Sequence, residues 1–156
     1  MKFKKKIFLI IIGVLVVIFF IWRFSVQENN IKKIIFYQND KKITEISVEV
    51  ADNPLKREEG LMHRETLPEN QGMLFVFPKE DYYSFWMKGA LIPLDLIFLN
   101  KNKNIVSIIK NTPPCKANPC PLYQPKEKSQ YVIEVNAGFC DQYKINKEIK
   151  ILFSFN

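Results

Sequence analysis

Histidine and cysteine are scarce in this sequence, which has one histidine, His63, and three cysteines among 156 residues. A structural zinc site takes about four such ligands, and a Cys–His dyad needs a histidine beside the nucleophile, so neither kind of site is expected. The few methionines are potential ligands of cuprous copper, but methionines in apolar runs usually serve packing. We therefore expect no metal ion and no cofactor.

Glycine is scarce too, and the motifs of common nucleotide-binding and hydrolytic sites are absent. The five glycines form no phosphate-binding loop, and no serine occupies a G-x-S-x-G motif. We therefore assign no catalytic residue from motifs alone.

Basic charge is in excess, with a net charge of +7, but it is not gathered where a nucleic acid would need it. Residues 1–30 hold five basic side chains and one acidic one, which leaves 18 basic and 15 acidic side chains in residues 31–156. No basic stripe able to displace many phosphate counterions is visible. The sequence therefore predicts no nucleic-acid binding.

An uncharged apolar run, residues 7–22, follows four lysines near the N-terminus. As a helix it would be about 24 Å long, slightly shorter than the hydrocarbon core of a bilayer, and flanking lysines, Trp22 and Arg23 would extend it to the interfaces. The positive-inside rule places the lysines in the cytoplasm. We expect residues 1–27 to anchor the chain in the cytoplasmic membrane with the remainder on the extracytoplasmic (periplasmic) side. A cleaved signal peptide is the alternative, and it would secrete the domain to the same side.

Residues 28–156 are expected to form one exported domain of short strands. Apolar runs of strand length, rich in aromatic and branched residues, recur between turn signals, and residues 44–50 alternate between apolar and polar. One helix is expected at 54–62, since Asn53 and Pro54 supply an N-cap and a first-turn proline. This pattern predicts an all-β sandwich or barrel with one short helix. The expected strands are 32–38 (at an edge), 44–50, 73–77, 85–87, 91–99, 105–110, 130–135 and 148–155.

Several stretches in this order and spacing resemble a known family, the bacterial and archaeal "domain of unknown function 192". They are ADNPLKREEGLMHRETLPENQGMLFVFP (51–78), SFWMKGALIPLDLIFL (84–99), the proline–cysteine steps of 113–121 and YVIEVNAGF (131–139). The resemblance implies a compact β-sandwich of jelly-roll type, often found behind an export signal. It implies no activity.

Asp95 is the most unusual residue, because it is a carboxylate within the apolar run LIPLDLIFL. Such a group is costly to bury unless it is paired or accepts several hydrogen bonds. Arg64, Trp86, Lys88 and nearby backbone donors are the candidates to satisfy it. In a cleft, a buried acid is a candidate general base or ligand anchor; the alternative is a purely structural pair.

Trp86 and Lys88 alternate with Phe85 and Met87, so the sequence places them together on one face of a strand. An aromatic ring beside a cation and an acid suits a small polar or anionic ligand, such as a sugar or an acidic metabolite. Arg64 is able to bind a carboxylate through both of its terminal nitrogens, either that of Asp95 or that of a ligand. The alternatives are a core tryptophan and internal pairing of the arginine.

Cys115 and Cys120 lie five residues apart in a proline-rich loop of the part expected to be exported. A small disulfide between them is the natural interpretation in an oxidising compartment. Cys140 is left over, and three cysteines allow three different single bridges, so the pairing and the redox state of Cys140 stay open at this point.

These patterns favour a non-catalytic module that binds a ligand or an envelope protein, with Arg64, Trp86, Lys88 and Asp95 as the hypothetical site. One alternative is a hydrolase or lyase that acts on cell-envelope material with Asp95 as general base. Another is a structural or assembly protein that pairs with a partner chain through the strand at 32–38.

Overall fold

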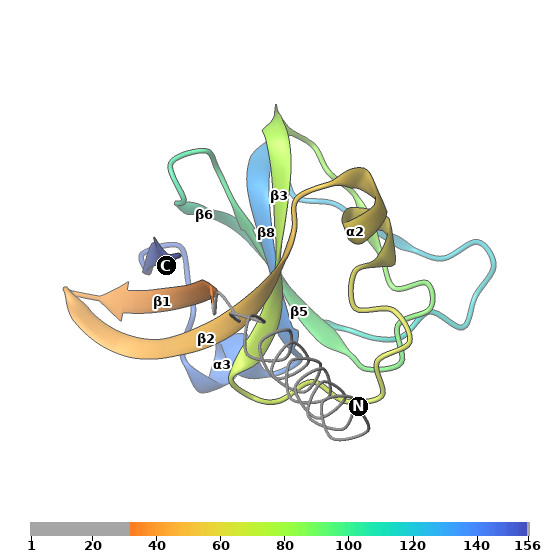
Figure 1. The fold of residues 1–156 in the computed structure, drawn as a ribbon, viewed down its shortest axis with the longest axis horizontal. Coiled ribbons are helices and arrows are strands. Elements are labelled where there is room, and N and C mark those ends of the chain that lie inside the picture. The colour runs from red at the N-terminus through yellow and green to blue at the C-terminus, as the bar shows by residue number, and fades with distance from the viewer. Residues whose placement is uncertain (1–31, 156) are drawn as a thin grey trace, which may run out of the picture. The chain divides into compact units, whose positions relative to one another are not determined.

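The structure, a computed structural model, describes residues 32–155 (Figure 1). The predicted anchor, residues 7–22 within the segment 1–27, lies outside the described residues. Within the described range, no helix has both the length and the apolar character that a bilayer crossing requires.

Seven strands form one strongly curled sheet in the order β6-β5-β8-β3-β2-β1-β9 (Figure 1). Neighbouring strands are antiparallel except β2 and β3, which are parallel. The prediction of a mostly β domain is confirmed, but the strands share one curled sheet instead of the two facing sheets of a jelly-roll sandwich. The seven strands are β1 (Lys32–Gln38), β2 (Lys41–Ala51), β3 (Gln71–Asp81), β5 (Leu94–Leu99), β6 (Ile105–Thr112), β8 (Ser129–Asn136) and β9 (Lys150–Ser154).

A separate two-stranded ribbon pairs β4 (Phe85–Trp86) with β7 (Leu122–Tyr123). The sequence predicted β4 within 85–87. It predicted no strand at 122–123, because these two residues lie in a proline-rich loop. Strands β5 and β6 are antiparallel and form a hairpin across residues 100–104, where the sequence NKNKN is typical of a turn.

The central strand β5 is buried along its whole length and therefore on both faces. Successive side chains of a strand point to opposite faces, so alternate residues of β5 enter two different cores. The first core contains Ile97 and Leu99 with Phe139 and Cys140. The second core contains Leu94, Leu96 and Phe98 with residues of the segment after α2 and of β4.

Helix α2 (Pro54–Glu59) begins as the sequence predicted and ends three residues earlier. The Asn53 side chain accepts a hydrogen bond from the Lys56 N–H at 3.0 Å, and Gly60, with a φ of 51°, ends the helix. A second helix, α3 (Phe139–Gln142), was not predicted, since one turn is too short to show a helical period.

Strand β1 is an interior strand, which corrects the prediction that residues 32–38 form an edge. It pairs with β2 on one side and with β9 on the other, where Phe36 lies opposite Ile151. The partner comes from the far end of the chain, and no local pattern reveals such a pairing. The predicted route of assembly through this strand is therefore blocked by β9.

Candidate functional site

A cavity of about 210 Å³ opens between the segment that follows α2 and the residues around β4. Its walls come from the second core and are mostly apolar, and a small number of polar side chains join them. This combination is typical of sites for small organic ligands. The apolar and aromatic lining includes Leu61, Met62, Phe75, Phe77, Tyr83, Phe85, Trp86 and Leu94, and the polar lining comprises Arg57, Glu58, Glu59, Ser84, Lys88 and Glu134.

Glu134 of β8 is the buried acid of this cavity, whereas Glu58 and Glu59 are exposed. It lies opposite Met73 of β3 and Leu96 of β5, two residues of the second core, so its side chain projects from an apolar face of the sheet. Glu134 is only 5% exposed, and no residue of the described range gives its carboxyl group a hydrogen bond or an ion pair.

Burial raises the pKa of Glu134 to about 8. The group is therefore mostly protonated at neutral pH, when it is able both to donate and to accept a hydrogen bond. Sequence reasoning missed this residue, although a usable signal was present. The run YVIEV sets an acid among apolar residues just as LIPLDLIFL does for Asp95.

Trp86 and Lys88 lie at the solvent side of the same cavity. Trp86 is 45% exposed, and the Nζ atom of Lys88 lies 5.3 Å from the centroid of its ring, within the range of a cation–π contact. Phe85 and Met87 are buried, so the predicted alternation along this segment is confirmed. Of the four predicted site residues, these two line one cavity.

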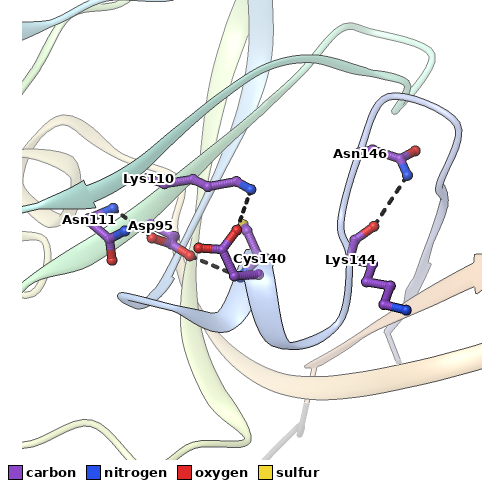
Figure 2. A network of polar contacts seen from close by, with 7 residues as sticks. Asp95, Lys110, Asn111, Cys140, Lys144 and Asn146 are labelled. Carbon is purple, nitrogen blue, oxygen red and sulfur yellow. Dashed lines mark hydrogen bonds and ion pairs between the residues drawn. The ribbon is translucent and has the colours of Figure 1, made fainter.

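Asp95 is satisfied elsewhere, by backbone groups of β6 and α3 (Figure 2). It is fully buried, and its two oxygens accept hydrogen bonds from the backbone N–H groups of Asn111, at 2.8 Å, and Cys140, at 2.9 Å. Asp95 lies opposite Val135 of the first core, whereas Glu134 faces the second. The carboxylate thus ties β5 to the end of β6 and to α3.

The expected contacts of Asp95 with Arg64, Trp86 and Lys88 are not present among the described residues, which corrects the proposed four-residue constellation. Arg64 instead donates two hydrogen bonds to the carboxylate of Glu49, one of them 2.7 Å long, and this bonding lowers the pKa of Glu49. The bidentate partner expected for the arginine thus exists, but it is a residue of β2.

The disulfide between Cys115 and Cys120 is confirmed, with their Cα atoms 5.8 Å apart. The N–H of Cys115 donates to the carbonyl of Met87 at 3.1 Å, which holds the disulfide loop next to β4. Cys140 is a free, buried thiol, and burial raises its pKa, so it is protonated and unreactive at neutral pH. Within residues 32–155, no group of three or more histidine, cysteine or acidic side chains is arranged to hold a metal ion.

Comparison with known proteins gives matches to uncharacterised proteins. The model of the family DUF192, "Uncharacterized ACR", matches residues 34–153. The UPF0127 protein PF1050 of Pyrococcus furiosus is 32% identical over 111 residues, which are 69% of this chain and 88% of that protein. A UPF0127 protein of Thermococcus sibiricus is 32% identical over 104 residues, 65% of this chain and 61% of its own length.

Two solved structures share the fold. One, from Sinorhizobium meliloti, is named as a candidate transcription regulator; it has a TM-score of 0.71 and 27% identity and covers 78% of this chain and 92% of its own. The other, a protein of unknown function from Novosphingobium aromaticivorans, has a TM-score of 0.70 and 24% identity. It covers 77% of this chain and 83% of its own. The likeness to the second shows the fold alone.

We expect Asp95→Ala to destabilise the domain by roughly 3 kcal/mol, because it leaves two buried backbone N–H groups without an acceptor. Asp95→Asn keeps one acceptor oxygen, so its stability should lie between that of the wild type and that of Asp95→Ala. Urea denaturation followed by circular dichroism measures both. Asp141→Ala is the control, since it removes an exposed carboxylate paired with Lys110 and should cost less than about 1 kcal/mol. Equal losses for Asp95→Ala and Asp141→Ala would contradict the assigned role.

Glu134 makes the stability of the domain depend on pH. Its pKa is about 8 in the folded state and about 4.5 for an unperturbed glutamate, so between these values the folded chain holds a proton that the unfolded chain releases. Stability is therefore full below pH 4.5 and falls as the pH rises to about 8. We expect the free energy of unfolding to drop by up to about 4 kcal/mol more in the wild type than in Glu134→Gln between pH 5 and 8.5.

Urea denaturation of the wild type and of Glu134→Gln at these two pH values measures the difference. The substitution keeps the size of the side chain and removes its titration, while all other groups titrate in both proteins. Parallel pH dependences would show that Glu134 ionises freely in the folded state.

Proposed function

The chain belongs to the DUF192 family of uncharacterised proteins, and on that footing we propose that it is a membrane-anchored, extracytoplasmic module that binds a small organic molecule without transforming it. The binding site is the cavity between α2 and β4, with Glu134 inside and Trp86 and Lys88 at its solvent side.

The unpaired carboxyl group of Glu134 is the observation that carries this proposal. A buried polar group without a partner costs roughly 1 to 3 kcal/mol, and an apolar side chain of similar size would remove that cost. All the strand neighbours of Glu134 are apolar, so the sheet itself makes no use of the acid. A ligand group that bonds to the carboxyl group would offset the cost, and the ring of Trp86 offers a surface on which the ligand can stack.

The geometry supports binding over catalysis. A general base must reach its substrate, whereas Asp95, the base of the alternative hypothesis, is fully buried and occupied by two backbone donors. Glu134 does reach a cavity, but no second acid, base or nucleophile of the described range is hydrogen-bonded to it. A single acid of this kind suits recognition.

Two features support the extracytoplasmic location. A disulfide in a loop typically forms and persists in an oxidising compartment, and Cys115 and Cys120 are so bonded. The apolar run at 7–22 with its flanking lysines supplies the means of export and anchoring. The name of the Sinorhizobium protein suggests regulation of transcription, but the 18 basic and 15 acidic side chains of residues 31–156 give no excess of charge suited to DNA.

Screening a fragment library by thermal shift tests the binding function. We expect hits that raise the melting temperature of the full chain, and about tenfold weaker binding of the same fragments to Trp86→Ala, from which the stacking surface is missing. Leu122→Ala is the matched control, because Leu122 lies opposite Trp86 in the ribbon, is 65% exposed and lies outside the cavity. A library without hits, or hits that Trp86→Ala binds unchanged, would reject this site.

The anchor has its own test, a fusion of alkaline phosphatase to the C-terminus of the full chain in a bacterial host. We expect an active phosphatase in the membrane fraction, since this enzyme folds only outside the cytoplasm, and an unfused chain with its full mass of 18.4 kDa. Deletion of residues 1–27 should leave the phosphatase inactive. A shorter soluble product outside the cytoplasm would show cleavage, and an inactive full-length fusion would reject export.

A further inference from the structure

The charged groups that line the cavity define the kind of ligand that Glu134 can receive. Besides Glu134 they are Arg57, Glu58, Glu59 and Lys88, and Tyr83 adds a titratable hydroxyl. The strands on either side of Glu134 contribute Met73 and Leu96 at this position, and hence no charge.

Both basic side chains of the cavity are held by other groups. Arg57 donates to the carbonyl of Val76 at 2.8 Å, and its guanidinium carbon lies 5.3 Å from the centroid of the Phe77 ring. Lys88 lies over the ring of Trp86. Neither forms an ion pair with Glu134 within the described range, so the acid has no internal cation.

The walls near Glu134 suit an apolar or cationic group and offer little to an anion. The rings of Phe75 and Phe85 meet edge to face with their centroids 5.1 Å apart, and Phe77 stacks on Tyr83. Aromatic faces attract cations, and the exposed carboxylates of Glu58 and Glu59, which also line the cavity, would repel an anion.

We propose that the ligand is a small primary ammonium compound, whose cationic end pairs with the Glu134 carboxylate and whose apolar body contacts the aromatic walls. This inference rests on the proposed function and names the chemical class of its ligand. It replaces the small polar or anionic ligand expected from the sequence, because the buried acid of the cavity lacks a cation and both basic groups of the lining contact other groups.

The pairing includes a proton transfer. In the free protein at neutral pH, Glu134 holds its proton; on binding, the carboxylic acid releases that proton to solvent and becomes the carboxylate that accepts hydrogen bonds from the ammonium group. The ligand stays protonated, since alkylamines lose their proton only near pH 10. Binding at pH 7 and below therefore releases close to one proton per ligand, and the affinity rises with pH until Glu134 is ionised.

Isothermal titration calorimetry of the full chain with n-butylamine, butan-1-ol and butanoate tests this inference. We expect the amine to bind at least tenfold more tightly than the alcohol, and butanoate not to bind. Between pH 6 and pH 7 the affinity for the amine should rise about tenfold, and above pH 8 it should level off. Titrations in two buffers of different ionisation enthalpy give the number of protons released.

Glu134→Gln keeps the shape of the side chain and should lose both the preference for the amine and the proton release. Glu69→Gln removes an exposed carboxylate outside the cavity and should change neither. The inference is overturned if the alcohol binds as tightly as the amine, or if Glu134→Gln binds the amine like the wild type. If Trp86-dependent fragments of other classes bind while the amine does not, this inference fails and the proposed function stands; if nothing binds, both fail.

Discussion

Burial of the central strands on both faces is the constraint from which the other features of this domain follow. The central residues of strands β3, β8 and β5 have a core on each side, so a polar side chain buried among them is costly unless it finds a partner in the protein or in a ligand. Two buried carboxyl groups lie in this region, on opposite faces of the sheet. Asp95 receives two backbone N–H groups and helps to join three segments of the first core. Glu134 receives none and faces a cavity.

The difference between Asp95 and Glu134 shows how much of the candidate site could be predicted from the sequence. Both stand in apolar runs, LIPLDLIFL and YVIEV, and either pattern signals a buried charge. Whether the charge is satisfied depends on backbone groups from elsewhere, here the bulged end of β6 and the start of α3. These segments lie 16 and 45 residues from Asp95 along the chain, so no local pattern shows their approach.

The same limit applies to the fold. Local signals correctly gave most strands, the N-cap at Asn53, the alternation around Trp86 and the disulfide, because each depends on neighbours in the sequence. The arrangement of the strands depends on the parallel pairing of β2 with β3 and on the pairing of β1 with β9. These pairings join the strands into one curled sheet, whereas the pattern of short strands left a sandwich and a barrel both open.

The two basic residues that line the cavity contact groups other than Glu134, so neither side chain fills the space beside the acid. A lysine side chain that reached Glu134 would neutralise it and fill the space with its own methylene groups. Lys88 instead lies over Trp86 near the solvent, and Arg57 is held by the Val76 carbonyl and the Phe77 ring. Both cations thus have partners other than the acid. The domain retains an unpaired carboxyl group in an apolar cavity, and that group is best satisfied by a cation that comes from outside the chain.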